Sequence, residues 1–248
     1  MNQDAAFTAP WGGAVADGVG GGPAGDLASA AFVHRLAAGR VDSIDAESLA
    51  VSVRLANWDL RAHVERDPAL NGMATTFTGV FVSENDTLLL AHTGDSRAYR
   101  LRDGVLTQQT RDDSYVQVLV DRGLVAEEDA ATHPRRNLIT ASLSGGERDR
   151  VVVVEHEARP GDRWLLCSDG LTDYVPHDDI AAVISRHGGV TEAAGAAVAL
   201  GLAAGTRDNV TVVICDVEVG APERFPARAQ ASFYGAAAAR FTEGLESA

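Results

Sequence analysis

The chain has 248 residues, of which 46% are hydrophobic and 23% are charged, and this composition is that of a folded globular protein. The length suits one large domain, or a domain with a small appendage, with a sizeable buried core. Thirty-five acidic residues against 21 basic residues give a formal net charge of -14 at pH 7. Because that charge repels nucleic-acid backbones, we expect no nucleic-acid partner.

The N-terminus lacks the basic and apolar segments of a signal peptide. The longest apolar stretch, residues 193–204, is rich in alanine and too short to span a bilayer. The chain has 2 cysteines, Cys167 and Cys215, each in an apolar run, and they predict buried thiols rather than a zinc site or a disulfide framework. These features predict a cytoplasmic protein that does not cross a membrane.

The first third of the chain changes from helical to strand periodicity. Residues 14–16 predict a short strand that ends in a glycine-rich loop starting at Asp17. Apolar residues at helical spacing predict helices over 23–38 and 43–67, the second with Ser43 as its N-cap. Runs rich in β-branched and aromatic residues then predict three antiparallel strands, at residues 75–82, 87–92 and 98–101.

The rest of the chain continues this alternation of strands and helices. Pro160-Gly161-Asp162 is a strong turn signal between two predicted strands. Helices are predicted at residues 114–122, 127–132, 177–186 and 191–204, and strands at 151–157, 163–167 and 209–219.

Residues 220–248 differ from the rest because they contain prolines and then an alanine run. We expect a linker and a possible terminal helix there, mobile relative to the rest. The order of strands and helix pairs before residue 219 predicts an α+β fold with packed sheets and helices outside them.

Several aspartates share one local context, beside small residues at the start or end of a predicted strand. Asp17, Asp95, Asp169 and Asp208 have this context, and Asp4 lies near the beginning of the chain. Strand ends are rigid, so five carboxylates meet if these ends converge. Each Asp-Gly pair alone is also ordinary turn chemistry, and that alternative stays open.

Carboxylates gathered in this way cannot all remain ionised without a cation. Magnesium or manganese fits, because both are hard cations that prefer oxygen ligands. Two such ions about 4 Å apart can hold a phosphate group and activate a water molecule between them. The aspartates therefore predict a two-metal site, provided that they converge.

At these residues the sequence resembles the metal-dependent protein phosphatase family of type 2C (PPM) in its bacterial form. The matching segments occur in family order from Asn2 to about Val219, and together they are highly specific. They are Asn2-Gln3-Asp4-Ala5; Ala16-Asp17-Gly18-Val19-Gly20-Gly21 with Gly25-Asp26-Leu27-Ala28-Ser29; Thr75-Thr76; Gly94-Asp95-Ser96-Arg97-Ala98-Tyr99; Thr110-Arg111-Asp112 through Asn137-Leu138; Ser168-Asp169-Gly170-Leu171-Thr172-Asp173; and Asp208-Asn209-Val210-Thr211.

The resemblance implies an α+β fold in the form of a four-layer αββα sandwich. Two antiparallel β-sheets would be flanked by pairs of antiparallel helices, with the metals at one edge. The phosphatase domain would cover residues 1–219, with a flap at about 112–145 beside the active site, and residues 220–248 would form the C-terminal tail.

The resemblance also implies which residues hold two Mn²⁺ or Mg²⁺ ions. Asp17 would bridge both ions, with the carbonyl of Gly18 as a further ligand. Asp4 would act at one ion, directly or through water. Asp169 and Asp208 would hold the other ion.

A third, weaker ion is implied at Asp95 and Asp173 together with Asp169. In the implied mechanism a metal-bridged hydroxide attacks the phosphorus of phosphoserine or phosphothreonine without a covalent intermediate. Asp17, Asp169 and Asp208 would be the catalytic residues. Phosphoprotein substrates and an opposing serine/threonine kinase are the implied partners, and we expect a monomer.

One departure from the family pattern concerns substrate binding. Members usually carry an arginine for the substrate phosphate upstream of the aspartate that matches Asp4, and that position falls before Met1. A shortened sequence, an upstream start codon and a real divergence all remain open. Arg135, Arg136 or the terminal amine are candidate substitutes, whereas Arg97 is interpreted as a local salt-bridge partner.

Three functional hypotheses follow. The leading one is an active phosphoprotein phosphatase. The second is a pseudophosphatase, which binds phosphoproteins with little turnover, and the third is a metal hydrolase for small phosphoesters. The intact set of aspartates favours an active enzyme, because clustered carboxylates are costly to fold without a cation.

Overall fold

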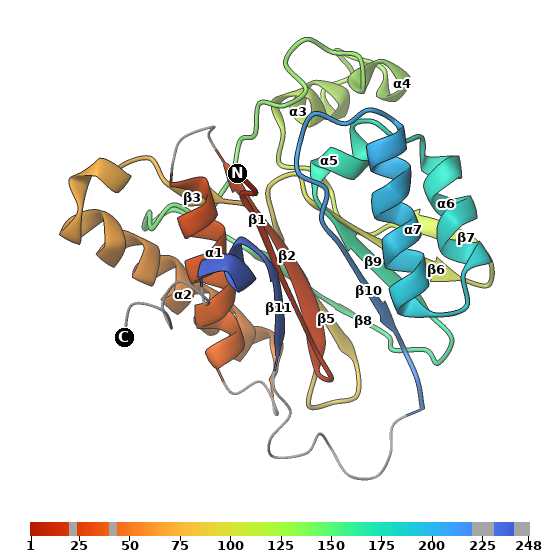
Figure 1. The fold of residues 1–248 in the computed structure, drawn as a ribbon, viewed down its shortest axis with the longest axis horizontal. Coiled ribbons are helices and arrows are strands. Elements are labelled where there is room, and N and C mark those ends of the chain that lie inside the picture. The colour runs from red at the N-terminus through yellow and green to blue at the C-terminus, as the bar shows by residue number, and fades with distance from the viewer. Residues whose placement is uncertain (20–23, 40–43, 220–230, 241–248) are drawn as a thin grey trace.

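The computed structural model shows four layers, helices on sheet on sheet on helices (Figure 1). Helices α1 (Gly25–Ala38) and α2 (Ala46–Arg66) cover one antiparallel sheet. Helices α6 (His177–Arg186) and α7 (Val190–Ala203) cover the other. The predicted α+β sandwich is therefore confirmed. The structure describes residues 1–19, 24–39, 44–219 and 231–240.

The first sheet is seven-stranded, with the order β11-β1-β2-β4-β5-β8 and with β3 paired to β2. Two of its adjacent pairs, β1–β2 and β4–β5, are hairpins of consecutive strands. The meander predicted over residues 75–101 is wrong in its third strand, because residues 97–102 pair within the other sheet. Its strands are β1 (Asp4–Ala9), β2 (Gly12–Val19), β3 (Ala74–Thr75), β4 (Phe77–Val82), β5 (Leu88–Thr93), β8 (Val152–His156) and β11 (Ser232–Gly235).

The second sheet is four-stranded, with the order β10-β9-β6-β7. In its β9–β10 pair Arg163 lies opposite Asp216 at one end, and Cys167 lies opposite Val212 at the other. Its strands are β6 (Arg97–Arg102), β7 (Val105–Gln108), β9 (Arg163–Cys167) and β10 (Val212–Asp216).

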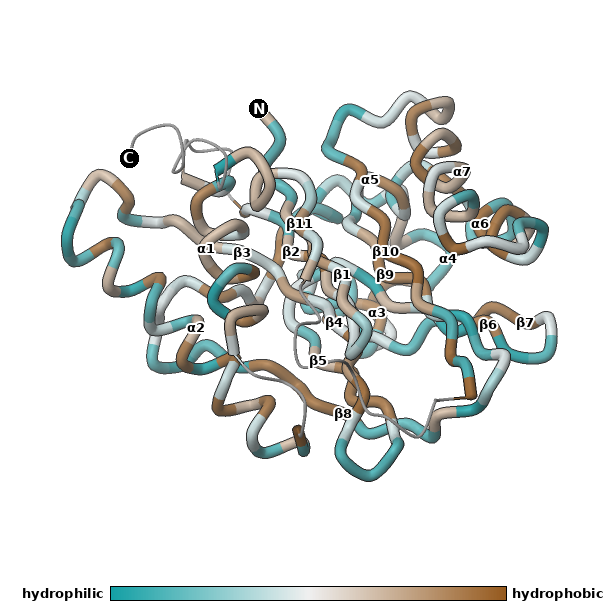
Figure 2. Tube along the Cα trace, turned by 60° about the horizontal axis from the view of Figure 1, so that its bottom comes forward, coloured by the Kyte–Doolittle hydropathy of each residue, from teal (hydrophilic) through white to brown (hydrophobic). Residues whose placement is uncertain are grey.

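Strand β9 shows how the layers are built, because its side chains alternate between two cores. Trp164 and Leu166 pack toward the first sheet, whereas Leu165 and Cys167 pack toward α6 and α7. All four side chains are fully buried. Hydrophobic segments run through β9 and β10 in the middle of the molecule (Figure 2), so these strands form a rigid base for residues at their ends.

The N-terminus of α2 differs from the prediction. Ser43, the predicted N-cap, lies outside the described residues, and the helix is capped by Asp45. The Asp45 side chain accepts a hydrogen bond from the Ser48 backbone N–H at 2.7 Å, and the Ser48 hydroxyl oxygen accepts one from the Asp45 backbone N–H at 2.9 Å. The capping box with Ser48 places the N-cap at Asp45, two residues after the predicted Ser43.

The flap carries two short helices, α3 (Tyr115–Asp121) and α4 (Glu127–Ala130), close to the two positions predicted for them. It extends from the same end of the sandwich as the chain's N-terminus (Figure 1). Two other short elements are the 3-10 helix η1 (Pro68–Leu70) and α5 (Asp169–Thr172).

The segment predicted as a C-terminal tail contributes to the first sheet. Strand β11 pairs with β1, residues 236–240 are helical, and Ala236 and Ala237 are buried in the core. Residues 220–230 and 241–248 lie outside the described part, and the domain boundary at residue 219 stays a prediction. No described helix combines the length and apolar character needed to cross a membrane.

Candidate metal centre

The β1–β2 hairpin brings the first two predicted ligands together. Asp4 begins β1 and lies directly opposite Asp17 near the end of β2. Asp4 is 1% exposed, and its Oδ2 accepts a hydrogen bond of 2.8 Å from the hydroxyl of Ser168, which follows β9 in the other sheet. The two sheets therefore meet at this pair of carboxylates.

The ends of β9 and β10 position the next two predicted ligands, Asp169 and Asp208. Asp169 is the first residue of α5, and Asp208 lies in the exposed loop before β10. A side chain at Gly170 would begin only 2.0 Å from the carbonyl oxygen of Asn209, so glycine is required for this approach. The same loop is tied to the N-terminus, because Asn209 Oδ1 accepts a 2.7 Å hydrogen bond from the Gln3 backbone N–H.

The remaining two predicted acids lie beside the first four. Asp95 occupies the turn between β5 and β6, and Asp173 caps the C-terminal end of α5. Both interact electrostatically with the others, since Asp169 contributes to the field at Asp95 and Asp173 contributes to the field at Asp169. The structure thus brings together all six predicted aspartates: Asp4, Asp17, Asp95, Asp169, Asp173 and Asp208.

The electrostatics of this cluster are those of carboxylates without a counter-charge. Burial, together with repulsion from neighbouring carboxylates, raises the pKa of Asp17 well above its ordinary value. The same two causes raise the pKa of Asp95 to about 8 and that of Asp169 to about 7. Burial also raises the pKa of Asp4, against hydrogen bonds that favour its charged form. The protein alone does not stabilise all these charges.

The donor set fits a hard divalent cation. Oδ1 of Asp4 and Oδ1 of Asp169 are buried and have no hydrogen-bond partner among the described residues. Within the described part, no arginine forms an ion pair with Asp4, Asp17 or Asp169. The described side chains include no three His, Cys, Asp or Glu already arranged around one point to hold a metal. Mg²⁺-type sites need few carboxylates, because waters and carbonyl oxygens complete them.

A buried network of hydrogen bonds that the sequence did not predict holds the backbone of this cluster in place. The Thr76 hydroxyl accepts a hydrogen bond from the Asp17 backbone N–H at 3.1 Å and lies 2.7 Å from the Ser96 hydroxyl. Thr78 continues the network, with its hydroxyl donating to the Ser96 carbonyl and lying 2.9 Å from His92 Nδ1. These residues fix the backbones that carry Asp17 and the neighbour of Asp95. Only the Thr75-Thr76 motif signalled them.

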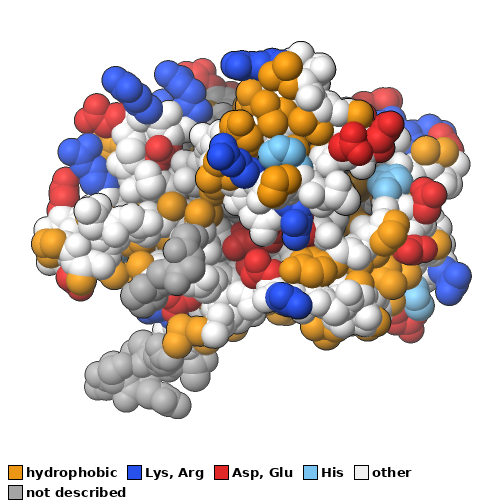
Figure 3. Space-filling view, turned by 90° about the horizontal axis from the view of Figure 1, so that it is seen from above, with side chains coloured by type: hydrophobic (Ala, Val, Ile, Leu, Met, Phe, Trp, Pro, Cys, Tyr) orange, Lys and Arg blue, Asp and Glu red, His pale blue; other side chains and the backbone are white. Residues whose placement is uncertain are grey.

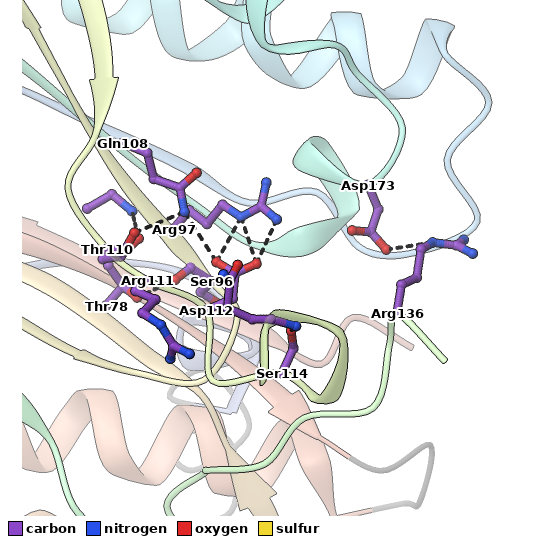
Figure 4. Close-up of polar contacts among 12 residues, drawn as sticks. Thr78, Ser96, Arg97, Gln108, Thr110, Arg111, Asp112, Ser114, Arg136 and Asp173 are labelled. Carbon is purple, nitrogen blue, oxygen red and sulfur yellow. Dashed lines mark hydrogen bonds and ion pairs between the residues drawn. The ribbon is translucent and has the colours of Figure 1, made fainter. Parts of the chain in front are cut away.

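Two arginine–aspartate contacts involve the flap, Arg97 with Asp112 and Arg136 with Asp173 (Figure 4). Arg97 forms a fork with Asp112, with an Nη2 to Oδ2 distance of 2.6 Å, so its interpretation as a local salt-bridge partner is confirmed. Arg136 Nε lies 3.3 Å from Oδ2 of Asp173. Arg135 instead lies over the Tyr115 ring, 5.6 Å from its centre. Of these candidates, Arg136 is the one in contact with a predicted ligand.

The face that carries the cluster is distinct in a space-filling view. Acidic side chains gather near the centre of this face, with hydrophobic and basic side chains around them (Figure 3). The arrangement can bind a divalent cation at the acids and an anion beside it.

Comparison with known proteins agrees with this geometry. The family model described as protein phosphatase 2C matches residues 1–201. The chain belongs to the protein phosphatase 2C family.

Relatives within this family support the match along most of the chain. The serine/threonine protein phosphatase PstP of Mycobacterium tuberculosis strain H37Rv is 43% identical over 219 residues. That match covers 87% of this chain and 42% of PstP, so the chain spans about two fifths of that relative's length. The serine/threonine phosphatase stp of Listeria monocytogenes is 32% identical, with 82% of each chain covered.

Solved structures of family members have the same fold. The crystal structure of the M. tuberculosis phosphatase PstP/Ppp gives a TM-score of 0.83 at 42% identity, covering 88% of this chain and 93% of that one. A crystal structure of the PstP catalytic domain in complex with two manganese ions gives a TM-score of 0.80 at 40% identity, with the same coverage. The two-sheet sandwich is therefore the architecture of a protein phosphatase 2C domain.

Proposed function

We propose that this chain is a metal-dependent protein serine/threonine phosphatase that hydrolyses phosphoserine and phosphothreonine with two bound Mn²⁺ or Mg²⁺ ions. One observation carries the proposal. The ends of both sheets bring buried aspartates together without a basic partner for Asp4, Asp17 or Asp169 in the described part of the chain. Such a cluster is costly unless a cation balances it.

The residues divide between two ions. Asp17 would contribute to both, and the Gly18 carbonyl and Asp4 would hold one side, with Asp4 acting directly or through water. Asp169 and Asp208 hold the other side. The Oδ1 atoms of Asp4 and Asp169, which have no hydrogen-bond partner within the described part of the chain, support this division, since Asp4 begins β1 of the first sheet and Asp169 follows β9 of the second.

A weaker third site is proposed at Asp95 and Asp173, together with Asp169. Asp173 already has a cationic neighbour in Arg136, which reduces the charge available to a metal there. This site therefore binds more weakly than the other two.

When bound, the two ions activate water and neutralise charge on the phosphate group. Around them the chain positions the acids, because Thr76 and Ser168 hold Asp17 and Asp4 by hydrogen bonds. Asp17, Asp169 and Asp208 are the proposed catalytic residues, since they set the geometry for in-line displacement.

The deciding experiment is release of phosphate from a phosphothreonine peptide with Mn²⁺, with and without a chelator. The proposal expects release that the chelator abolishes and that Asp169→Asn removes. A small aryl phosphate, assayed in parallel, gives the comparison of substrate classes through kcat/KM.

Each alternative hypothesis has its own outcome in this experiment. A folded, metal-loaded protein without turnover that still binds the phosphopeptide would be a pseudophosphatase. A kcat/KM far higher for the aryl phosphate than for the peptide would indicate a small-phosphoester hydrolase. No observation in the described residues favours either one.

The finer parts of the proposal concern the cellular setting. We place the chain in the cytoplasm as a monomer, with phosphoproteins as substrates and a serine/threonine kinase as the opposing enzyme. Sedimentation at micromolar concentration tests the monomer. Recovery of the substrates of a co-expressed kinase in dephosphorylated form tests the kinase pairing.

A further inference from the structure

The C-terminal segment lies against the strand that carries Asp4, although more than 200 residues separate them in sequence. Ala5 pairs with Gly235 and Thr8 pairs with Ser232 in the antiparallel β1–β11 ladder. Without β11, β1 would be an edge strand whose first residue is Asp4. Ends of edge strands fray most easily, so β11 holds this end of β1 in place.

The contact at Gly235 reaches Asp4 itself. Gly235 has a positive φ of 64°, and a side chain there would begin 2.2 Å from the carbonyl oxygen of Asp4. Only glycine combines that backbone conformation with so close an approach. The tail segment therefore packs against the backbone of a proposed metal ligand.

A second contact from the same segment reaches the start of α1. Arg240 donates to Oδ2 of Asp26 from Nε at 3.1 Å and from Nη2 at 2.5 Å. The side chain of Asp26 is 7% exposed and that of Arg240 is 34% exposed. A charge-assisted pair with a buried carboxylate fixes both partners more firmly than an exposed ion pair does.

Asp26 lies next to the backbone that carries the Gly18 carbonyl. A side chain at Gly18 would begin 2.3 Å from the carbonyl oxygen of Gly25, so the two glycine backbones are in contact. Gln3 is held in the same place, because its carbonyl accepts hydrogen bonds from the Ser29 hydroxyl at 2.6 Å and the Gly18 N–H at 3.2 Å. Arg240 thus holds the N-terminus of α1, against which the backbone of Gly18 packs.

We propose that residues 231–240 are a positioning element for the proposed metal centre, and that Arg240 is its positioning residue. One segment fixes Asp4 through β11 and the Gly18 region through Asp26, and these are the proposed ligands on one side of the centre. Asp169 and Asp208 lie at the ends of β9 and β10 in the other sheet, and no hydrogen bond or ion pair joins either one to the described residues of this segment. The inference rests on the proposed function, and it predicts an effect on one of the two ions.

The test is a calorimetric titration of the full chain with Mn²⁺, comparing wild type with Arg240→Gln. The variant is expected to bind one of two Mn²⁺ ions about tenfold more weakly, the loss typical of removing a group that orients a ligand. The other ion is expected to bind as in wild type. At saturating Mn²⁺ the variant should regain wild-type kcat and KM on a phosphopeptide.

A matched control and a second variant sharpen the test. Arg35→Gln removes another arginine–aspartate contact of α1, Arg35 Nε to Asp59 Oδ2 at 2.7 Å, but that pair is about half exposed and joins α1 to α2 rather than to the tail, so Mn²⁺ affinity should not change. Asp26→Asn removes the charge from the other side of the pair and should reproduce the effect of Arg240→Gln. It also carries the test if Arg240→Gln does not fold.

The outcomes separate the inference from the proposed function. Two Mn²⁺ sites of unchanged affinity in both Asp26→Asn and Arg240→Gln would overturn the inference alone. Equal weakening of both ions would also overturn it, because it would indicate a general loss of stability. A wild-type chain that binds no Mn²⁺ would overturn the proposed function and this inference together.

Discussion

The two ends of the β9–β10 strand pair both carry aspartates, and among the described residues only one end supplies a basic partner. At one end, Asp216 accepts two hydrogen bonds from Arg163, at 2.7 and 2.8 Å. At the other end, Asp169 and Asp208 follow β9 and precede β10, and neither forms an ion pair with a described arginine. The same two strands carry both ends, and the ends differ in whether an arginine is paired with the acid.

The paired end is complete as a structural unit. Arg163 also donates to the backbone carbonyls of Ile184, His187 and Gly188, which ties β9 to the end of α6. Its hydrogen bonds to Asp216 raise the pKa of this arginine. A carboxylate and a guanidinium that satisfy each other need no further counter-charge.

The unpaired end is incomplete on its own. Burial and neighbouring carboxylates raise the pKa of Asp169 to about 7, and its Oδ1 has no partner among the described residues. A fold retains such an arrangement when a ligand completes it. Asp216 therefore stabilises the fold through its ion pair, whereas Asp169 is available to bind a ligand.

The largest expected effect is at the unpaired end. Asp17→Asn removes the proposed bridging charge and should lower phosphopeptide turnover by about 100- to 1,000-fold, the size of a lost electrostatic contact to a transition state. The metal-free variant should be at least as stable as wild type, because one charge leaves a repulsive cluster. Phosphate release and chemical denaturation in chelator measure the two effects.

The control for Asp17→Asn is Asp103→Asn. Asp103 is an exposed acid paired with Arg159 in the β6–β7 turn, away from the cluster. It should leave turnover unchanged. Full turnover in Asp17→Asn would remove Asp17 from the site and would contradict the division between the two strand ends.

The next effect is at the paired end. Arg163→Met leaves Asp216 and three backbone carbonyls without their donor, and it should lower the free energy of unfolding by about 3 kcal/mol. Turnover per folded molecule and Mn²⁺ affinity should not change. The double variant Arg163→Met with Asp216→Leu should recover part of the loss, since no buried charge is left unpaired.

Mn²⁺ itself should stabilise the unpaired end. At one hundred times its dissociation constant, an ion that binds only the folded chain adds about 2.7 kcal/mol to the free energy of unfolding. Thermal denaturation with and without chelator measures this gain. Arg163→Met should gain as much as wild type, because distant sites are additive, whereas Asp17→Asn should gain less.

A smaller effect is expected at Arg136, which lies at the border of the unpaired cluster. Arg136→Met should raise the phosphopeptide KM about tenfold with a smaller change in kcat, because a charged hydrogen bond to phosphate is worth roughly 1.5 kcal/mol. Arg135→Met is the control, since Arg135 lies over the Tyr115 ring. An unchanged KM in Arg136→Met would assign phosphate binding to another group.

The sequence predicted the layers because periodicity is local. The strand and helix patterns needed no knowledge of distant contacts, and the aspartates stood out because each one interrupts such a pattern beside a small residue. β11 could not be predicted in this way. Four residues, Ser232–Gly235, carry little periodic signal, and their role depends on pairing with β1 at the far end of the chain.

The supporting residues escaped prediction for the same reason. Thr76, Ser96 and His92 act through side-chain contacts between strands, and nothing in their local sequence shows which hydroxyl meets which ring. Arg240 lies in an alanine-rich segment whose sequence resembles a tail. Sequence patterns locate groups that need a ligand better than they locate groups that position one.

The smallest effect tests one of these missed residues through pH. His92 is buried with Nε2 3.0 Å from the Arg111 carbonyl, and burial lowers its pKa below the ordinary value of 6.5, against Asp112 and Asp113 nearby. In the unfolded chain His92 therefore binds a proton near pH 6.5, whereas in the folded chain it does so only at a lower pH. The contribution of His92 to stability is present above that pH and is lost as the pH falls, by about 1 kcal/mol per unit.

His92→Gln should remove this pH dependence, because glutamine keeps a hydrogen-bond donor and does not titrate. The measurement is the free energy of unfolding of both chains in chelator from pH 7.5 to 5.5, taken as a difference. Other titrating groups, including His156 and the aspartate cluster, are present in both chains and largely cancel in that difference. A flat difference would mean that His92 has the same pKa in the folded and unfolded chains, and the burial of its ring would then carry no pH-dependent stability. A difference of the opposite sign, with His92 adding stability as the pH falls, would mean that it is protonated in the folded chain, and the link between the Thr78 network and the flap would then be an ionic one.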